Sequence, residues 1–212
     1  MTNCGSAKDP RLTYVEYWDR RPKNRSSKMR PSRYLEPYLK NALPANPDWT
    51  CLEVGVVPGQ MLLWMAKRFG YRVMGVDLSE RVFDLQPAFR DQGVDAEFVQ
   101  ADFLDWTPKR QFEVVLSSGF VEHFRNYEEV IRKHWDLVRP GGFLVLTIPA
   151  WSPMQRILRR VMYEKHFYQK IVASHHTEMM NLATLRQAVD LCSGGTVTIA
   201  RYIGEMKIWF RA

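Results

Sequence analysis

The turn that decides the fold lies in CLEVGVVPGQ, residues 51–60, where an apolar run of strand length meets an acid, two glycines and a proline. The overlapping segment PGQMLLWMAKRFG (58–70) places apolar side chains at helical spacing and ends in glycine, as helices commonly do. A short buried strand that turns at once into a helix predicts the start of a layered α/β fold. It also raises the question of which ligand the turn holds.

Outward from this turn, strand-like and helix-like patterns alternate along the chain. Strands are predicted at 50–56, 71–79, 95–103, 112–120 and 143–149. Helices are predicted at 58–70, at 79–93 with an interruption or kink at Pro87, and at 126–142 with a stop at Pro140 and two glycines. This alternation predicts a doubly wound, mostly parallel sheet with helices on both faces. A helix at 182–195 and two strands, at 196–204 and 207–212, would complete a seven-stranded sheet.

Length and composition predict a single soluble domain. A chain of 212 residues with 46% apolar content has the size of one α/β domain. No apolar stretch approaches the roughly 20 residues that cross a bilayer, and the N-terminus lacks the apolar core of a signal peptide, so we expect a cytoplasmic protein. Cys4, Cys51 and Cys192 lie far apart, without the spacing of a disulfide framework or a metal site.

Positive charge is concentrated in two segments. Residues 8–33 hold nine Lys or Arg against three acids, and residues 151–180 hold five against two, whereas the whole chain is only +7. Within the second segment, apolar residues recur at helical spacing over 153–172, with Arg156, Arg159 and Arg160 on the other side. We therefore predict an amphipathic basic helix, which also suits peripheral contact with a membrane surface.

The spacing of the glycines in the opening turn distinguishes two kinds of nucleotide-like ligand. A dinucleotide-binding dehydrogenase would need glycines at 55, 57 and 60, but the chain has Val57 and Gln60 at the last two positions. An acid followed by glycines at alternate positions is a different pattern, and the stretch from Glu53 to Gly59 meets it at every position but Val57. On this turn, and on GVDLS (75–79), ADF (101–103) and SSGFVEHF (117–124), the chain resembles the Rossmann-like S-adenosylmethionine-dependent methyltransferases.

The resemblance implies a cofactor, S-adenosyl-L-methionine, whose product is S-adenosyl-L-homocysteine. By analogy with the family, Glu53 lies near the methionine part, Asp77 binds both ribose hydroxyls, and Asp102 meets the adenine amino group with Phe103 against the ring. A carboxylate suits the ribose because it accepts two hydrogen bonds at once. The full expected cofactor site comprises Trp18, Glu53, Gly55, Val56, Gly59, Asp77, Leu78, Ala101, Asp102, Phe103 and Ser118, and no metal is expected.

Val57 departs from the family's pattern. Glycine at that position admits a positive φ or a close approach of the cofactor, and a β-branched residue makes positive φ costly. The loop is therefore expected either to take an ordinary conformation or to have lost part of its affinity. A cofactor-binding but inactive partner subunit stays open as an alternative for this reason.

Methyl transfer needs few catalytic groups, because the sulfonium already carries an activated methyl. The protein must align the acceptor, exclude water and, where the acceptor is a hydroxyl, remove a proton. His123 and Glu122 follow the fourth strand, where the resemblance places the methyl group, and His175 and His176 follow the basic helix. His123 is the expected base, with Glu122 as its orienting partner or as the base itself, and His176 as a further candidate.

Two missing motifs and the basic segments narrow the acceptor. The fourth strand ends in SSGF rather than the Asn/Asp-Pro-Pro-aromatic turn of the amino-methylating nucleic-acid enzymes, and no Pro-Cys follows it for cytosine C5 methylation. We therefore expect transfer to an oxygen, of a hydroxyl or a carboxylate. Because the two basic segments would attract an anion, we expect the acceptor to be a small anionic metabolite or a sugar- or lipid-linked molecule. An RNA methyltransferase stays open as an alternative, and the oligomeric state is undetermined.

These expectations together predict one methyltransferase domain in four segments. They are an N-terminal helical cover (1–49), a cofactor-binding core (50–150), a basic helical lid (151–181) and a last helix with C-terminal strands (182–212).

Overall fold

The structure, a computed structural model, describes residues 35–149, 176 and 178–194. Several expectations lie outside these residues: Trp18, His175, the basic helix at 153–172 and the two C-terminal strands. Within the described residues, none of the helices is long and apolar enough to cross a bilayer.

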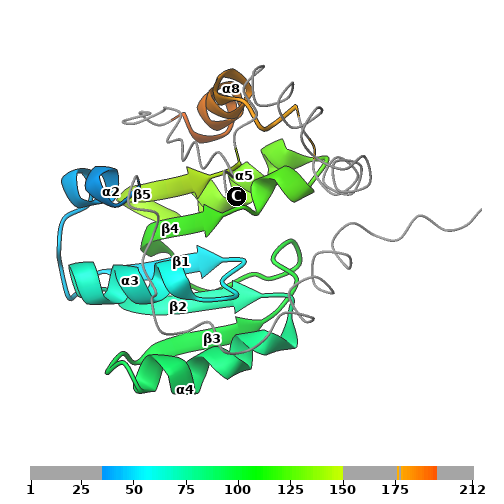
Figure 1. Cartoon of the computed structure of the whole chain (residues 1–212). Helices are drawn as coiled ribbons and strands as arrows, with labels where there is room; N and C mark the ends of the chain where they lie inside the picture. The colour runs from blue at the N-terminus through cyan, green and yellow to red at the C-terminus, as the bar shows by residue number, and fades with distance from the viewer. Residues whose placement is uncertain (1–34, 150–175, 177, 195–212) are drawn as a thin grey trace, which may run out of the picture.

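The core is a parallel sheet whose strand order reverses next to the opening turn. The strands are β1 (Thr50–Val54), β2 (Arg72–Asp77), β3 (Ala96–Gln100), β4 (Phe112–Ser118) and β5 (Val138–Thr147), in the spatial order β3-β2-β1-β4-β5. All four pairings are parallel, and the strand arrows in Figure 1 point the same way. The order switches between β1 and β4, and ligands of such sheets bind at the carboxyl ends beside the switch. The predicted fold class is confirmed, with five of the seven expected strands in the part that the structure describes.

Helices cover both faces of the sheet. They are α2 (Glu36–Ala42), α3 (Gln60–Phe69), α4 (Leu85–Arg90), α5 (Tyr127–Asp136) and α8 (Leu182–Ser193), with short 3-10 helices η2 (Glu80–Asp84) and η3 (Val121–His123). Side chains alternate along β1, so Cys51 packs with α2, α3 and α4 while Leu52 and Val54 pack with α5 and α8. Figure 1 shows α8 lying over α5 at the top of the molecule.

The first helix after the opening turn shows why this sequence folds locally as it does. Gly59 and Gly70 bracket α3 with φ of 80° and 76°, a left-handed conformation that glycine adopts without steric cost. The middle of α3 is buried, from Leu62 to Ala66, and so is Phe69 at its end. The helix therefore starts and stops where the sequence pattern predicts.

Two helix boundaries differ from the expectation. Helix α5 ends at Asp136 rather than at Pro140, because β5 already begins at Val138 and the register against β4 shifts between Phe112 and Val114. Pro140 therefore lies inside an irregular start of β5, where the register shift makes room for a residue without an N–H. In the second helical segment the break precedes Pro87, which sits in the first turn of α4, where its missing N–H costs nothing.

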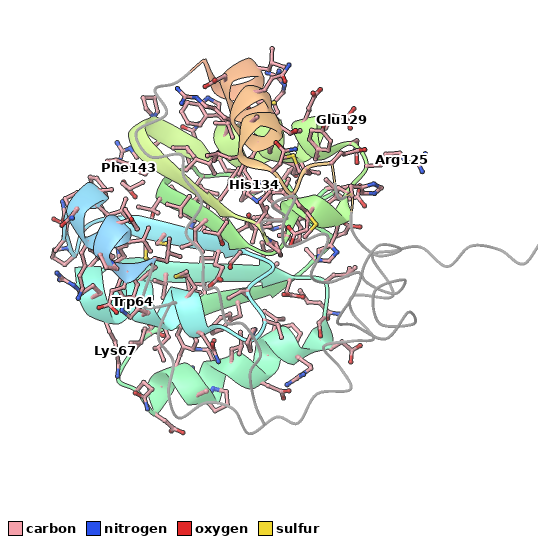
Figure 2. The ribbon with its side chains drawn as sticks, turned by 45° about the horizontal axis from the view of Figure 1, so that its top comes forward. Trp64, Lys67, Arg125, Glu129, His134 and Phe143 are labelled. Atoms are coloured by element: carbon pink, nitrogen blue, oxygen red, sulfur yellow. The ribbon has the colours of Figure 1, made fainter. Side chains whose placement is uncertain are left out.

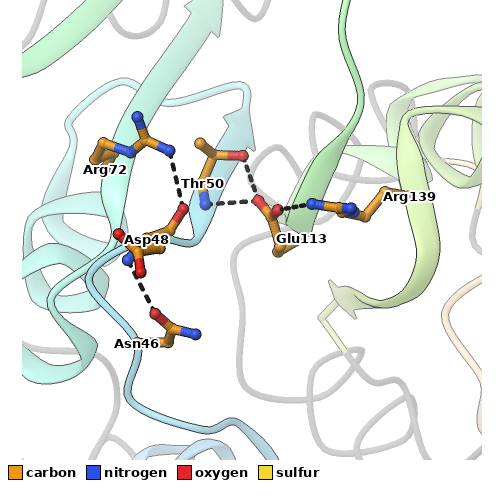
Figure 3. Close-up of polar contacts among 6 residues, drawn as sticks. All are labelled: Asn46, Asp48, Thr50, Arg72, Glu113 and Arg139. Carbon is orange, nitrogen blue, oxygen red and sulfur yellow. Dashed lines mark hydrogen bonds and ion pairs between the residues drawn. The ribbon is translucent and has the colours of Figure 1, made fainter.

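The amino end of the sheet is closed by a polar cluster around Glu113 (Figure 3). Its Oε2 accepts hydrogen bonds from the Thr50 N–H at 2.7 Å and the Thr50 hydroxyl at 2.6 Å, and its Oε1 pairs with the Arg139 guanidinium. Burial alone would raise the pKa of Glu113, but these donors outweigh it and lower the pKa to about 2. Three strands, β1, β4 and β5, are thereby tied together at this end.

Candidate functional site

A cleft opens at the other end of the sheet, where the carboxyl ends of β1, β2, β3 and β4 meet. It is partly open to solvent. Its walls are formed by Gly55, Val76, Asp77, Leu78, Ala101, Asp102, Phe103, Phe120, His123 and Phe124. The turn that opened the sequence argument thus borders the cleft.

Asp77 ends β2 and fixes the loops around it. Its Oδ2 accepts the Val57 N–H at 2.9 Å and its Oδ1 accepts the Ser79 N–H at 2.9 Å. Asp77 also lines the cleft, where a carboxylate can accept hydrogen bonds from ligand hydroxyls. Asp77 is therefore both a support of the opening turn and a candidate ribose ligand.

Val57 does not need a positive φ, since no residue other than glycine has positive φ in the described part of the chain; its peptide bond to Pro58 is cis. Its N–H is bound by Asp77, and its side chain is buried in the core with Leu35, Leu39 and Leu43 of the α2 region. Val57 is absent from the cleft walls, so its isopropyl group does not obstruct the cleft.

Glu53 is not part of the cleft wall. The residue is only 4% exposed, and its Oε2 accepts the Leu62 N–H in the first turn of α3 at 2.8 Å. Burial raises the pKa of Glu53 well above its ordinary value, the Leu62 N–H offsets part of this rise, and the nearby Asp77 adds to it. Glu53 therefore anchors the strand-to-helix turn.

Asp102 and Phe103 follow β3 and line the cleft side by side. Oδ1 of Asp102 accepts the Leu104 N–H at 3.0 Å, and the Ala101 N–H donates to the Asp77 carbonyl at 2.9 Å. Phe103 is 4% exposed and forms one aromatic wall of the cleft. An acid beside an aromatic ring suits a flat heterocycle with an amino group.

Phe120 is a second aromatic residue of the cleft wall and packs directly on the glycine turn. A Cβ at Gly55 would lie 2.7 Å from Cδ2 of the Phe120 ring, and Gly55 has φ of 69°. The ring centroids of Phe120 and Phe124 are 4.9 Å apart, and Phe103 meets Phe120 edge-on at 5.8 Å. Glycine is thus required at position 55 both by its conformation and by the ring against it.

The two candidate catalytic residues that follow β4, Glu122 and His123, both lie in η3 but have different surroundings. His123 lines the cleft. Glu122 is 1% exposed, and neither carboxylate oxygen has a hydrogen-bond partner among the described residues. Burial raises the pKa of Glu122 to about 8, and its own main-chain N–H offsets only part of that rise. Glu122 therefore does not orient His123 in this structure, and its oxygens are closed off from the cleft.

His176 contacts η3 through its main chain. Its N–H donates to the Glu122 carbonyl at 2.7 Å, and the Met179 N–H donates to the His176 carbonyl at 3.0 Å. His176 was expected only as a further candidate base after the basic helix, and the contact with Glu122 is made by its main chain rather than its imidazole. His176 is not part of the cleft wall.

The cleft brings together six of the expected cofactor residues and one of the expected catalytic residues. Those in its wall are Gly55, Asp77, Leu78, Ala101, Asp102, Phe103 and His123. Those outside its wall are Glu53, Val56, Gly59 and Ser118, which hold the surrounding turns and strand ends. The residues that the sequence argument missed are Val76, Phe120 and Phe124; the two phenylalanines stand in the quoted SSGFVEHF, where their aromatic character was the available signal.

The chemistry of the walls fits S-adenosylmethionine. Asp77 and Asp102 supply acceptors for ribose hydroxyls and an amino group, Phe103 supplies a flat apolar face, and Gly55 lets the main chain come close. Among the described residues, no group of three or more His, Cys, Asp or Glu side chains is placed to hold a metal ion.

Comparison with known proteins gives the same assignment. Residues 51–142 match the model of a methyltransferase domain family. Trans-aconitate 2-methyltransferase of Paracidovorax citrulli is 31% identical over 115 residues, 52% of this chain and 43% of that protein. The enzyme of the same name from Escherichia coli O157:H7 is 23% identical over 150 residues, 65% of this chain and 58% of that protein. The chain spans about half the length of these curated relatives.

Solved structures agree on the fold. Geranyl diphosphate C-methyltransferase from Streptomyces coelicolor A3(2) superposes with a TM-score of 0.62 at 19% identity, over 88% of this chain and 80% of that chain. A methyltransferase of Bacillus halodurans C-125, described as putative, superposes with a TM-score of 0.59 at 19% identity, over 76% of this chain and 68% of that chain. At such identities the likeness establishes the architecture alone.

Proposed function

We propose that this chain, which belongs through residues 51–142 to the Rossmann-like methyltransferase family, transfers a methyl group from S-adenosylmethionine to a carboxylate oxygen of a small anionic metabolite. The proposal rests on the grouping of three side chains at the strand ends. The ends of β2, β3 and β4 bring Asp77, Asp102 and His123 into a single cleft beside the glycine turn. A nucleoside and an acceptor would therefore meet in one place.

Three residues of the cleft bind different parts of the cofactor. Asp77 accepts hydrogen bonds from the ribose hydroxyls, Asp102 accepts one from the adenine amino group, and Phe103 packs against the ring. S-adenosylmethionine supplies a methyl group on a positively charged sulfur, which takes back the bonding electron pair when the methyl leaves. The protein's remaining task is to hold an acceptor oxygen in line with that bond and to keep water out.

The curated relatives favour a carboxylate as the acceptor. Both are named for trans-aconitate, a polycarboxylate, and the methyltransferase family model matches residues 51–142, which include the cleft. The two basic segments of the sequence, 8–33 and 151–180, would raise the local concentration of such an anion. A carboxylate is already ionised at neutral pH, so the acceptor needs no base.

His123 has a different role for each kind of oxygen. With a carboxylate acceptor, the imidazole donates a hydrogen bond that holds the anion. With a hydroxyl acceptor, it would take the hydroxyl proton as the methyl bond forms. The two roles predict opposite behaviour at acid pH, because protonation strengthens a donor and disables a base.

The test is a methylation assay that separates these roles. The purified chain is incubated with S-adenosylmethionine and either trans-aconitate or an analogue in which hydroxyls replace the carboxylates, and products are detected by mass spectrometry. We expect a methyl ester of the carboxylate compound and a kcat that does not fall between pH 7.5 and 6. A methyl ether, together with a kcat that falls with acid, would replace the carboxylate proposal by hydroxyl methylation.

The same assay with His123→Ala measures what the imidazole contributes. For a carboxylate we expect KM for the acceptor to rise about tenfold or more while kcat stays within about tenfold, since a binding donor is lost and no base is removed. A fall in kcat of about 10² to 10⁴ would identify His123 as a base. Binding of S-adenosylhomocysteine, followed by calorimetry, should be unchanged in this variant. Absence of any binding by the wild type would contradict the whole proposal.

A further inference from the structure

Two neighbouring residues of α5 hold the segment that carries Asp102 and Phe103. Nζ of Lys133 donates to the Leu104 carbonyl at 2.6 Å and lies 5.5 Å from the centroid of the Phe103 ring. The His134 ring centroid is 4.5 Å from that of Phe103. The helix thereby fixes the main chain of this segment through one residue and its aromatic ring through both.

His134 is an unusual residue for a purely apolar packing position. It is 0% exposed, its Nδ1–H donates to the Val130 carbonyl at 2.7 Å, and its Nε2 has no partner among the described residues. Burial lowers its pKa to about 4, so the ring is neutral and packs as an aromatic. Figure 2 shows His134 in the interior, in contrast to Lys67 and Arg125 at the outer surface.

The segment itself has little regular structure of its own. Residues 101–104 lie between β3 and a turn, so their position depends on contacts at both ends. The Ala101 N–H is held by the Asp77 carbonyl, and the Leu104 carbonyl is held by Lys133. Between these two hydrogen bonds lie Asp102 and Phe103, the residues that would meet the adenine.

We propose that Lys133 and His134 are positioning residues for the nucleoside, acting through Asp102 and Phe103. The inference rests on the proposed function, because it assumes that the cleft binds an adenine nucleoside. Lys133 sets the path of the main chain, so that the Asp102 carboxylate is aimed at the amino group. His134 sets the plane of the Phe103 ring.

The proposal is tested by measuring how a change in α5 depends on the adenine amino group. Lys133→Met keeps the aliphatic stem and removes the ammonium. Calorimetry measures the affinity of this variant for S-adenosylhomocysteine and for S-inosylhomocysteine. The second ligand has a carbonyl oxygen in place of the adenine amino group. We expect the first affinity to fall about three- to tenfold, the range of one hydrogen bond, and the second to fall less than about twofold.

Lys67→Met is the matched control, because Lys67 makes a comparable hydrogen bond, to Gln92 at 2.7 Å, on the surface of α3. It should leave both affinities unchanged. Equal losses for the two ligands in Lys133→Met would show a general structural effect and overturn the inference. Unchanged affinities would overturn it as well, while a wild-type chain that binds neither ligand would contradict the proposed function itself.

His134 provides a second, independent pair of variants. His134→Ala removes the ring against Phe103, whereas His134→Phe restores an aromatic ring of similar size. We expect His134→Ala to weaken S-adenosylhomocysteine binding about tenfold and His134→Phe to recover most of that loss. Thermal unfolding of each variant without ligand identifies any that is unfolded. If both variants fold and bind equally well, or equally poorly, the ring of His134 does not position Phe103.

Discussion

The two ends of the sheet each bury a glutamate, and the two carboxylates behave in opposite ways. Glu113 at the amino end is 9% exposed, is bound by Thr50 and Arg139, and has its pKa lowered to about 2. Glu122 at the carboxyl end is 1% exposed, has no hydrogen-bond partner for either oxygen among the described residues, and has its pKa raised to about 8. Burial raises the pKa of both carboxylates, and it is outweighed only at Glu113, where Thr50 and Arg139 donate to the carboxylate.

The largest effect is expected from removing the bound carboxylate. Glu113→Ala leaves the Thr50 N–H and hydroxyl without their acceptor and should lower the free energy of unfolding by roughly 2–4 kcal/mol. Ligand affinity should stay unchanged, since the cleft is at the other end. Denaturant unfolding and calorimetry measure the two quantities. Glu97→Ala is the control, because the Glu97–Arg110 pair is exposed and should contribute less than about 1 kcal/mol.

At the carboxyl end, Asp77→Ala should act on ligand binding. Loss of a charged acceptor is expected to weaken binding of S-adenosylhomocysteine by roughly 1.5–3 kcal/mol. Some stability is lost too, since the Val57 and Ser79 N–H groups are released. Unchanged titration calorimetry would remove Asp77 from the ribose site. It would leave Asp77 only as a support of the loops.

Glu122→Gln should stabilise the protein, and only at higher pH. The pKa of Glu122 is about 8 in the folded protein, above its ordinary value of 4.5. Glu122 therefore costs no stability below pH 4.5, where it is protonated in both states, and it costs stability as the pH rises through 8. The amide mimics the protonated acid, so the gain should be on the order of 1–2 kcal/mol at pH 8 and close to zero at pH 4.5. Thermal or denaturant unfolding at the two pH values measures it. A loss of stability at pH 8 would show that the carboxylate is bound there.

The smallest effect is expected from trimming one donor of the amino-end cluster. Arg139→Gln removes an ion pair whose guanidinium side chain is 56% exposed, and should lower stability by about 0.5–1 kcal/mol at neutral pH. Because the lowered pKa of Glu113 contributes stability above about pH 4.5 that is lost as the pH falls towards 2, the acid unfolding transition should begin at higher pH in the variant. An unchanged acid transition would assign the lowered pKa to Thr50 alone.

The framework of the cleft could be predicted from local patterns. Gly55, Asp77 and Asp102 stand at the ends of apolar runs, and parallel strands bring their carboxyl ends to one edge. The bounds of α3 follow from Gly59 and Gly70, which a local rule identifies. These features depend only on residues near them in the sequence.

The remaining parts depend on tertiary contacts that no local pattern contains. Phe120 belongs to the cleft because its ring meets Gly55, 65 positions earlier, and His134 because α5 packs behind Phe103. Helix α5 ends before Pro140, because β5 begins at Val138 and pairs there with β4. Likewise, Glu122 and His123 are adjacent in sequence, and only the fold shows that one is sealed and the other lines the cleft.

The strand order also governs when the cleft comes into existence. Its walls are contributed from both sides of the switch between β1 and β4, and that junction pairs residues such as Cys51 and Val114, which are distant in the chain. Closing so long a loop is slow, so we expect this junction to form late in folding. A ligand cannot bind before both walls are present. We therefore expect a bound ligand to prolong the lifetime of the folded protein by slowing unfolding, and to leave the rate of folding almost unchanged.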